Sequence, residues 1–195
     1  AATAPGAMEL LAPLRDAGTP CGLLRDAVAD ELGLPRRALV ALGGGDNMMA
    51  AIGAGAVEDG VAVMSLGTSG TIFASSPRPI CDPTGELAPF CDSTGGWLPL
   101  GCTMNATVAT ETARALFGHD LAAFEHAVSA CPDGADGVLC LPFFTGERSP
   151  DLPAATGAFL GLTPRNSTPR HLLRAAMEGA TYALLRLLDR LRSLG

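Results

Sequence analysis

The chain has 195 residues, 48% of them hydrophobic and 17% charged, a composition typical of a compact α/β protein and unlike that of a disordered one. Its net charge of −7 at pH 7 argues against nucleic acid or an anionic membrane surface as a partner. All 13 basic residues are arginine, which excludes a Walker A phosphate loop and chemistry through a lysine nucleophile.

The compartment is predicted from two further absences in the sequence. No apolar run approaches the roughly 20 residues of a membrane span, and the first residues lack the pattern of a signal peptide, so we expect a cytoplasmic protein. The six cysteines are widely and irregularly spaced, with no C-x-x-C pair and no histidine at ligand spacing. We therefore expect them to be reduced and mostly buried, and no metal site.

The first part of the chain predicts two short helices with a strand between them. The first helix is expected at Asp26–Leu32. The apolar run Ala38–Leu42 predicts a strand, the three glycines Gly43–Gly45 predict a tight turn, and small residues from Met48 to Val57 predict the second helix.

Asp46 falls at the start of this second helix, and two roles are open to it. It could cap the helix, as many aspartates at this position do. It could instead be a general base beside a bound phosphate or sugar, towards which helix N–H groups would point. Because capping alone does not require three preceding glycines, we favour the second role.

A turn at Glu58-Asp59-Gly60 is the candidate domain boundary, and a β-hairpin follows it. Val61–Leu66 and Thr71–Ala74 are the predicted strands, joined by the turn Gly67-Thr68-Ser69-Gly70. Backbone N–H groups and two hydroxyls at such a tip suit the oxygens of a polyphosphate, although similar tips are common and mostly inert. Neither glycine cluster forms G-x-G-x-x-G between a strand and a helix, so a dinucleotide-binding fold is disfavoured.

The remaining elements alternate between strands and helices. In chain order we expect a long surface excursion at 75–96, a strand at Trp97–Cys102, helices at Thr107–Leu116 and Leu121–Ala130, a buried strand at Val138–Phe144, and a long helix opened by Thr168-Pro169. After the predicted buried strand, Glu147 and Arg148 could bind substrate, but a structural ion pair that fixes a loop is the favoured interpretation. Glu178 in the long helix is also interpreted as structural.

Four ordered sequence blocks resemble the FGGY family of carbohydrate kinases. They are LGGGDN at 42–47, MSLGTSG at 64–70, LPFFTGERSP at 141–150, and GAFLGL at 157–162 followed by HLLRAAME at 171–178. Within the family they look most like the members that phosphorylate xylulose. The resemblance covers 42–178, and the segment before Leu42 carries no motif.

The resemblance implies an α/β protein with the actin-like, ribonuclease H-like ATPase fold, in which two domains hold sugar and MgATP in the cleft between them. Residues 1–59 would be the end of the sugar-binding domain I, and residues 60–195 the first part of the ATP-binding domain II. The chain would then be well under half of a full-length relative. It would lack the first phosphate loop and the adenosine-binding glycine segment.

The resemblance also assigns roles to individual residues. Asp46 would be the general base that takes the proton from the attacking sugar hydroxyl, and it would bind substrate together with Asn47. Asn47 favours a ketopentose, so the implied reaction is ATP-dependent conversion of D-xylulose to D-xylulose 5-phosphate. The ATP-binding residues would be Gly67, Thr68 and Ser69 around the terminal phosphates, and Ala106 and Thr107 near the ribose or adenine. Mg²⁺ would come with ATP.

Several alternatives remain open. The substrate could be ribulose, gluconate or glycerol, since no residue in this chain decides among them. The chain could also be an inactive module used for assembly or regulation, since it lacks the first phosphate loop. A homodimer is possible, because relatives are often dimers.

Overall fold

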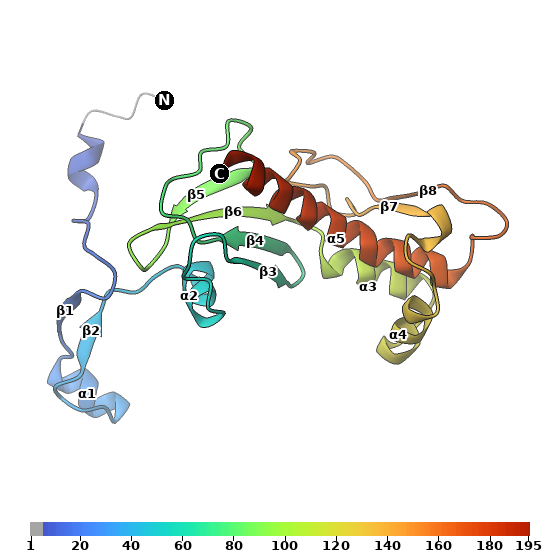
Figure 1. Ribbon diagram of the computed structural model, residues 1–195. Coiled ribbons are helices and arrows are strands. Elements are labelled where there is room, and N and C mark those ends of the chain that lie inside the picture. The colour runs from blue at the N-terminus through green and yellow to red at the C-terminus, as the bar shows by residue number, and fades with distance from the viewer. Residues whose placement is uncertain (1–5) are drawn as a thin grey trace.

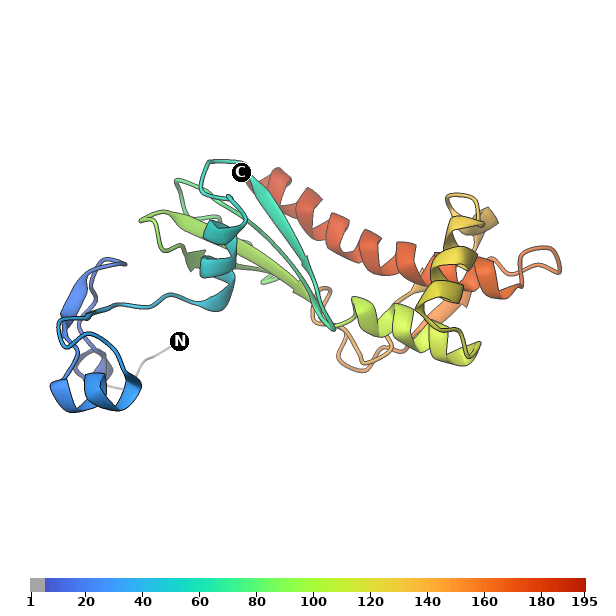
Figure 2. The ribbon, with the colours of Figure 1, turned by 90° about the horizontal axis from the view of Figure 1, so that it is seen from below.

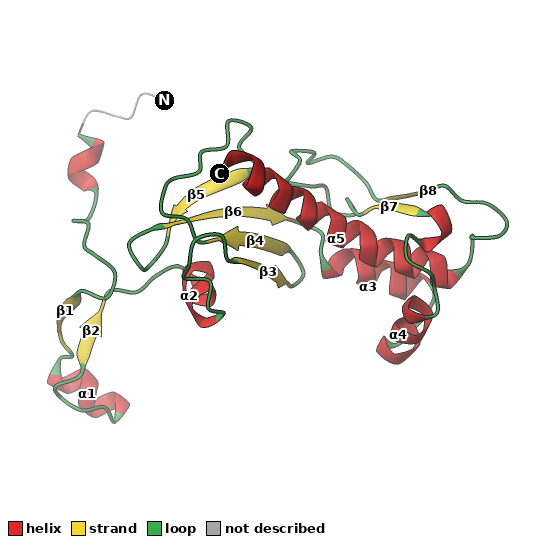
Figure 3. Cartoon of the chain, in the orientation of Figure 1, coloured by secondary structure: helices red, strands yellow, loops and turns green. Residues whose placement is uncertain are grey.

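The computed structural model of the protein describes residues 6–195 (Figure 1). In chain order the elements are η1 (Ala7–Leu10), β1 (Pro20–Leu23), α1 (Asp26–Leu32), β2 (Leu39–Ala41), α2 (Asp46–Gly53), β3 (Ala62–Leu66), β4 (Gly70–Ala74), β5 (Leu87–Cys91), β6 (Trp97–Thr103), α3 (Thr107–Leu116), α4 (Leu121–Ser129), η2 (Ala135–Gly137), β7 (Leu139–Leu141), β8 (Ala158–Leu160) and α5 (Pro169–Leu194). Figure 3 shows the resulting mixture of helices and short sheets, so the α/β class is confirmed.

The largest sheet has four antiparallel strands in the order β3-β4-β6-β5. Side chains alternate between its two faces with the period of two expected of strands. On one face, Phe73, Leu98 and Leu100 pack with Met48 and Ala51 of helix α2. The sheet is therefore covered on this side by the helix that begins at Asp46.

The other face of the sheet is covered by the second half of helix α5. Leu184, Leu187 and Leu191 of α5 pack there on Ile72 and Leu87, the core of this layer. Two glycines allow the close approach. A Cβ on Gly101 would lie 3.0 Å from Leu187 Cδ1, and one on Gly70 would lie 2.8 Å from Leu184 Cδ1. The long helix and the sheet thus form a closely packed α/β layer.

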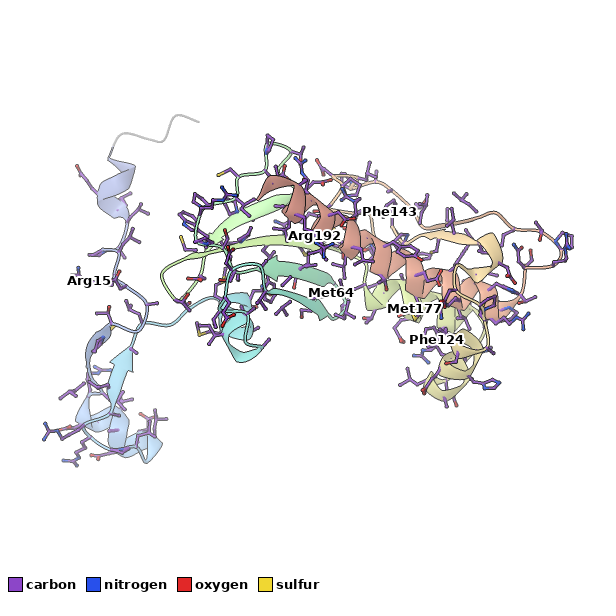
Figure 4. All side chains as sticks on the ribbon, in the orientation of Figure 1. Arg15, Met64, Phe124, Phe143, Met177 and Arg192 are labelled. Carbon is purple, nitrogen blue, oxygen red and sulfur yellow. The ribbon has the colours of Figure 1, made fainter. Side chains whose placement is uncertain are left out.

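The first half of helix α5 belongs to a second core. This core is shared by α3, α4, η2 and the two-stranded sheet β7-β8. Two partly buried side chains, Phe124 of α4 and Met177 of α5, also pack against this second core (Figure 4). Gly179 allows strand β7 to lie against the helix, since a Cβ there would be 2.4 Å from the carbonyl oxygen of Cys140.

The segment from 6 to 45 lies apart from both cores, and Figure 2 shows it joined to the rest of the molecule by an extended linker. Strands β1 and β2 pair with each other antiparallel and are exposed along their lengths. Helix α1 spans Asp26–Leu32 as predicted, and Gly33 ends it in the left-handed conformation with φ 65°.

Most of the predicted elements are confirmed, including the β3-β4 hairpin and the long helix α5. The prediction of a surface excursion at 75–96 is wrong in part, because Leu87–Cys91 pairs with β6 as an edge strand and Leu87 is buried. Pro89 obscured this strand in the sequence, although an edge strand tolerates proline.

Two further corrections concern the glycine segment and the strand near 140. The three glycines Gly43–Gly45 do not form a tight turn. They run extended into α2, and Gly45 has φ −64° and ψ 152°. The strand predicted at Val138–Phe144 is only three residues long, and its flanking leucines, Leu139 and Leu141, are 57% and 41% exposed. It pairs only with β8, and α5 covers one face of it, which leaves the opposite side chains exposed.

The cysteines within 6–195 are all free thiols, but the expectation that most are buried is wrong. Cys131 and Cys140 are buried and Cys102 is half-buried, whereas the other three are exposed. Desolvation raises the pKa of the Cys140 thiol to about 11, so this thiol is an inert core group. Over the part of the chain that the structure describes, no helix is both long and apolar enough to cross a membrane.

Candidate functional site

The tip of the β3-β4 hairpin is tied to the start of helix α3 by two backbone hydrogen bonds. The Ala106 N–H donates to the carbonyl oxygen of Thr68 at 3.1 Å, and the Thr107 N–H donates to that of Gly67 at 3.0 Å. Within the tip, the Gly67 N–H donates to the Ser69 carbonyl at 3.0 Å. The structure therefore brings together the five residues that the sequence suggested for ATP.

The same bonds decide which groups of this cluster can bind a ligand. The N–H groups of Gly67, Ala106 and Thr107 already have partners, so they are not free to cradle a phosphate. The side chains of Thr68 and Ser69 are exposed, and within residues 6–195 their hydroxyls have no protein partner. The Thr68 and Ser69 hydroxyls, and the backbone N–H groups of these two residues, which donate none of the backbone hydrogen bonds found over 6–195, are the available donors at this tip.

A small apolar notch lies beside the tip, between the end of β3, the start of α3 and the middle of α5. Its lining is Leu66, Ala106, Thr107, Thr110, Met177, Ala180 and Thr181, and its volume is about 80 Å³. Pockets that enclose small molecules usually measure about 300–1,000 Å³. The notch can accept the edge of a ligand but cannot enclose a nucleotide.

A buried polar node fixes the backbone just before α3. The Glu147 carboxylate, 1% exposed, accepts hydrogen bonds from the Met104 N–H at 2.7 Å and the Arg148 N–H at 2.8 Å. Its second oxygen accepts from Asn105 Nδ2 at 3.1 Å, and that amide also donates to the Gly146 carbonyl at 2.6 Å. The node joins two segments about 40 residues apart in the chain and sets where α3 begins.

The expected ion pair between Glu147 and Arg148 is wrong. Glu147 does fix a loop, but through amide donors rather than through the Arg148 guanidinium, which is in none of the ion pairs found over 6–195. A buried carboxylate needs several donors to offset its desolvation, and the nearby N–H groups supply them. Asn105 was not singled out from the sequence, because no local pattern marks it.

Glu178 is structural, as expected. Its carboxylate accepts from the Gly134 N–H at 3.0 Å and from Arg174 Nε at 2.6 Å, one turn earlier on α5. These contacts fasten the loop before η2 to the long helix.

Asp46 and Asn47 form the first turn of α2. Gly45, not Asp46, is the N-cap residue, and Asp46 is the first residue of the helix. The Asp46 Oδ1 accepts from the backbone N–H of Asn47 at 2.7 Å and from its side-chain amide at 3.2 Å. Asp46 is exposed, and no ion pair within 6–195 includes it, so its carboxylate is open to a ligand.

The glycines before Asp46 lie against the loop between β5 and β6. A Cβ on Gly44 would be 2.5 Å from Ser93 Oγ and 2.6 Å from Met49 Cε, so the glycine lets these two side chains lie against the backbone. Asp92 shapes this loop by accepting from the N–H groups of Thr94 and Gly96 at 2.8 and 2.7 Å. Burial raises the pKa of Asp92, but these hydrogen bonds lower it by more, so the pKa lies below its usual value.

A groove of about 590 Å³ runs between this loop, the glycine segment and the chain near residue 15. It is lined by Pro13, Leu14, Arg15, Ala17, Leu42, Gly43, Gly44, Gly45, Met48, Phe90, Cys91, Asp92 and Ser93. It is an open surface groove rather than an enclosed pocket. Figure 4 labels Arg15, which lies on the segment that forms the outer wall.

The two groups of candidate residues are not in contact. The glycine segment touches the loop before Trp97, where β6 begins, whereas the hairpin tip adjoins Thr103, where β6 ends. The seven residues of β6 span about 20 Å at the usual rise per residue. The structure thus assembles a hydroxyl-lined tip at one end of the sheet and an open carboxylate towards the other.

The comparison with protein families gives one match over most of the chain. Residues 62–195 match the sequence model described as "FGGY family of carbohydrate kinases, C-terminal domain". This range contains the hairpin tip, the start of α3 and the Glu147 node.

Individual proteins similar to this chain are described as xylulose kinases. The one from Haemophilus influenzae is 41% identical over 187 residues, which are 96% of this chain and 38% of that protein. The one from Streptomyces rubiginosus is 46% identical over 172 residues, 88% of this chain and 33% of that protein. The crystal structure of xylulose kinase from Bifidobacterium adolescentis superposes with a TM-score of 0.75 at 42% identity, covering 80% of this chain and 31% of that one. The chain therefore spans about a third of the relatives it matches.

Proposed function

The chain belongs to the FGGY family of carbohydrate kinases, and on that premise we propose that it is the central part of an enzyme that phosphorylates D-xylulose with ATP. The observation that carries the proposal is the bonding of Thr68 and Gly67 to the start of α3, which collects the proposed ATP residues at one point. The relatives named as xylulose kinases, at 41% and 46% identity, support the choice of sugar.

We propose the actin-like, ribonuclease H-like fold, with residues 1–59 as the end of domain I and 60–195 as the first part of domain II. Helix α2 closes the first part and packs on the sheet of the second, so it forms the contact between them. Asp46 at its start would then face the cleft between the domains, where sugar and ATP meet.

In the proposed reaction the Asp46 carboxylate takes the proton from the sugar hydroxyl as that oxygen attacks the terminal phosphorus of ATP. The bond from this phosphorus to the bridging oxygen breaks, and ADP leaves with the electron pair. Asn47 binds the sugar, and the hydroxyls of Thr68 and Ser69 bind phosphate oxygens. Such transfer depends mainly on positioning and on charge stabilisation.

We propose that closure of the two domains in the full-length enzyme brings the two groups of residues together. The terminal phosphate would be held at the hairpin tip and the sugar against Asp46, and the two would meet when the domains close. Within 6–195 there is no group of three His, Cys, Asp or Glu side chains that could hold a metal ion. We propose that Mg²⁺ is carried by the phosphates of ATP.

The test is a substrate panel with the full-length protein. ADP release is measured with ATP and D-xylulose, ribulose, gluconate or glycerol, and D-xylulose is expected to give the highest kcat/KM. Preference for another sugar would refute the substrate assignment, and no activity on any of the four would refute the kinase assignment. The isolated 195-residue chain is expected to be inactive.

The role of Asp46 is tested with Asp46→Asn and the matched control Asp59→Asn, an exposed aspartate in the turn before β3. Asp46→Asn should lower kcat by about 10²–10⁴-fold, the usual contribution of a general base, while ATP still binds. Asp59→Asn should leave kcat unchanged. Near-normal turnover by Asp46→Asn would rule out the proposed base.

A further inference from the structure

Arg148 is held at the same end of the sheet as the hairpin tip. Its N–H donates to Glu147 Oε1 at 2.8 Å, and the same oxygen accepts from the Met104 N–H at 2.7 Å. Met104 directly follows the last residue of β6 and lies two residues before Ala106. The buried node therefore fixes the Arg148 backbone next to the proposed ATP residues.

The Arg148 side chain is exposed and is not committed to a protein carboxylate. Six other arginines are ion-paired in the described part of the chain: Arg36, Arg114, Arg174, Arg186, Arg190 and Arg192. An unpaired arginine on a surface is common by itself. Arg148 differs because the carboxylate of Glu147, which is only 1% exposed, fixes the Arg148 backbone beside the proposed ATP-binding tip.

Cys102 of β6 lies at the same end of the sheet as Arg148, next to Thr103, where β6 ends. Burial raises the pKa of the Cys102 thiol, and the positive charge of Arg148 opposes this effect. Cys102 packs against the core between the sheet and α2, the helix that begins at Asp46. The charge of Arg148 therefore acts at the end of β6 that adjoins the hairpin tip.

We propose that Arg148 is a further catalytic residue, whose guanidinium contacts the phosphoryl group as it passes from ATP to the sugar. This inference rests on the proposed kinase function. Charge on the phosphoryl oxygens must be stabilised during transfer, and a cation beside the hairpin tip would supply that stabilisation. A planar guanidinium binds two phosphate oxygens at once, which suits this role.

The experiment measures kcat, KM for ATP and the midpoint of thermal unfolding in full-length Arg148→Ala, Arg148→Lys and Arg165→Ala. Arg165 is the matched control: it is exposed and lies before α5, by the second core rather than the sheet. Arg148→Ala should lower kcat by at least about 100-fold, as removal of one charge-stabilising group does, with an unchanged unfolding midpoint. Arg148→Lys should recover part of the loss, millimolar ethylguanidinium should restore activity to Arg148→Ala, and Arg165→Ala should match the wild type.

Two results would overturn the inference. One is wild-type kcat and KM in Arg148→Ala. The other is a loss of kcat that accompanies a lower unfolding midpoint and is not rescued by ethylguanidinium, which would make Arg148 structural. Both leave the wild-type enzyme active, so they differ from failure of the proposed function, in which the wild type phosphorylates no sugar of the panel.

Discussion

Replacing Glu147 by alanine tests how much of the structure depends on the buried node. The carboxylate is 1% exposed, and it accepts from Met104, Arg148 and Asn105 at 2.7, 2.8 and 3.1 Å. Removal of the side chain takes the acceptor from the N–H groups of Met104 and Arg148, weakens the satisfaction of the Asn105 amide, which keeps its bond to the Gly146 carbonyl, and removes the longer contact from the Ser149 N–H. Because an unsatisfied buried donor costs about 1–3 kcal/mol, and water can enter to satisfy part of them, we expect a loss of about 3–5 kcal/mol, as for other broken buried polar pairs.

Urea denaturation followed by circular dichroism measures this loss, with Glu147→Gln as the isosteric control. Glutamine keeps one acceptor oxygen for the two backbone N–H groups, but it turns an amide towards Asn105 Nδ2. We therefore expect Glu147→Gln to cost only about 1–2 kcal/mol. In a chain of this size, the alanine variant should also unfold at a temperature lower by about 6–20 °C. Equal stability of Glu147→Ala and the wild type would refute the assignment of this node as a structural anchor.

Two further outcomes follow from close packing and from charge. Gly179→Ala should destabilise the protein by more than about 1 kcal/mol, the cost of overpacking a core, because the added Cβ would lie 2.4 Å from the Cys140 carbonyl oxygen. Gly53→Ala should instead stabilise the protein by about 0.5–1 kcal/mol, because no atom lies within 4 Å of the added Cβ and alanine favours the helix. Thermal unfolding of the two variants measures both changes. The bond from Arg190 holds the pKa of Asp82 well below its usual value. The stability that this pair contributes should be complete above the ordinary aspartate pKa of about 3.9 and should fall as pH drops through the lowered value. The difference between the wild type and Asp82→Asn should therefore shrink in acid, and a difference that is constant with pH would contradict this.

Local signals were sufficient for most elements of the fold. Helix α1 has a good starting residue in Asp26 and a glycine stop in Gly33, and the structure has the predicted bounds. The β3-β4 hairpin combines two β-prone runs with a glycine turn, and it forms as predicted. Asp46 was singled out in the same way, from a carboxylate placed between glycines and a helix, and its catalytic role stays a prediction.

The remaining features depend on contacts that no local pattern records. The expected exposed loop at 75–96 contains β5, whose Leu87 is buried only because α5 returns from the end of the chain to cover it. Asn105 and Glu147 are 42 residues apart, and each looks like an ordinary polar residue until the fold brings them together. The backbone bonds that join Thr68 to Ala106 are likewise invisible in the sequence, although both residues were suggested by family resemblance.

Helix α5 has a consequence for how the molecule unfolds. Its 26 residues extend about 39 Å, and its first half belongs to one core while its second half belongs to the other. Neither core is complete without this helix, so the two cannot melt independently. The region from β3 to the end of α5 should therefore unfold as one cooperative unit. A destabilising substitution beside β7, in one core, should also lower the stability of the β3-β4 hairpin, which packs on the other.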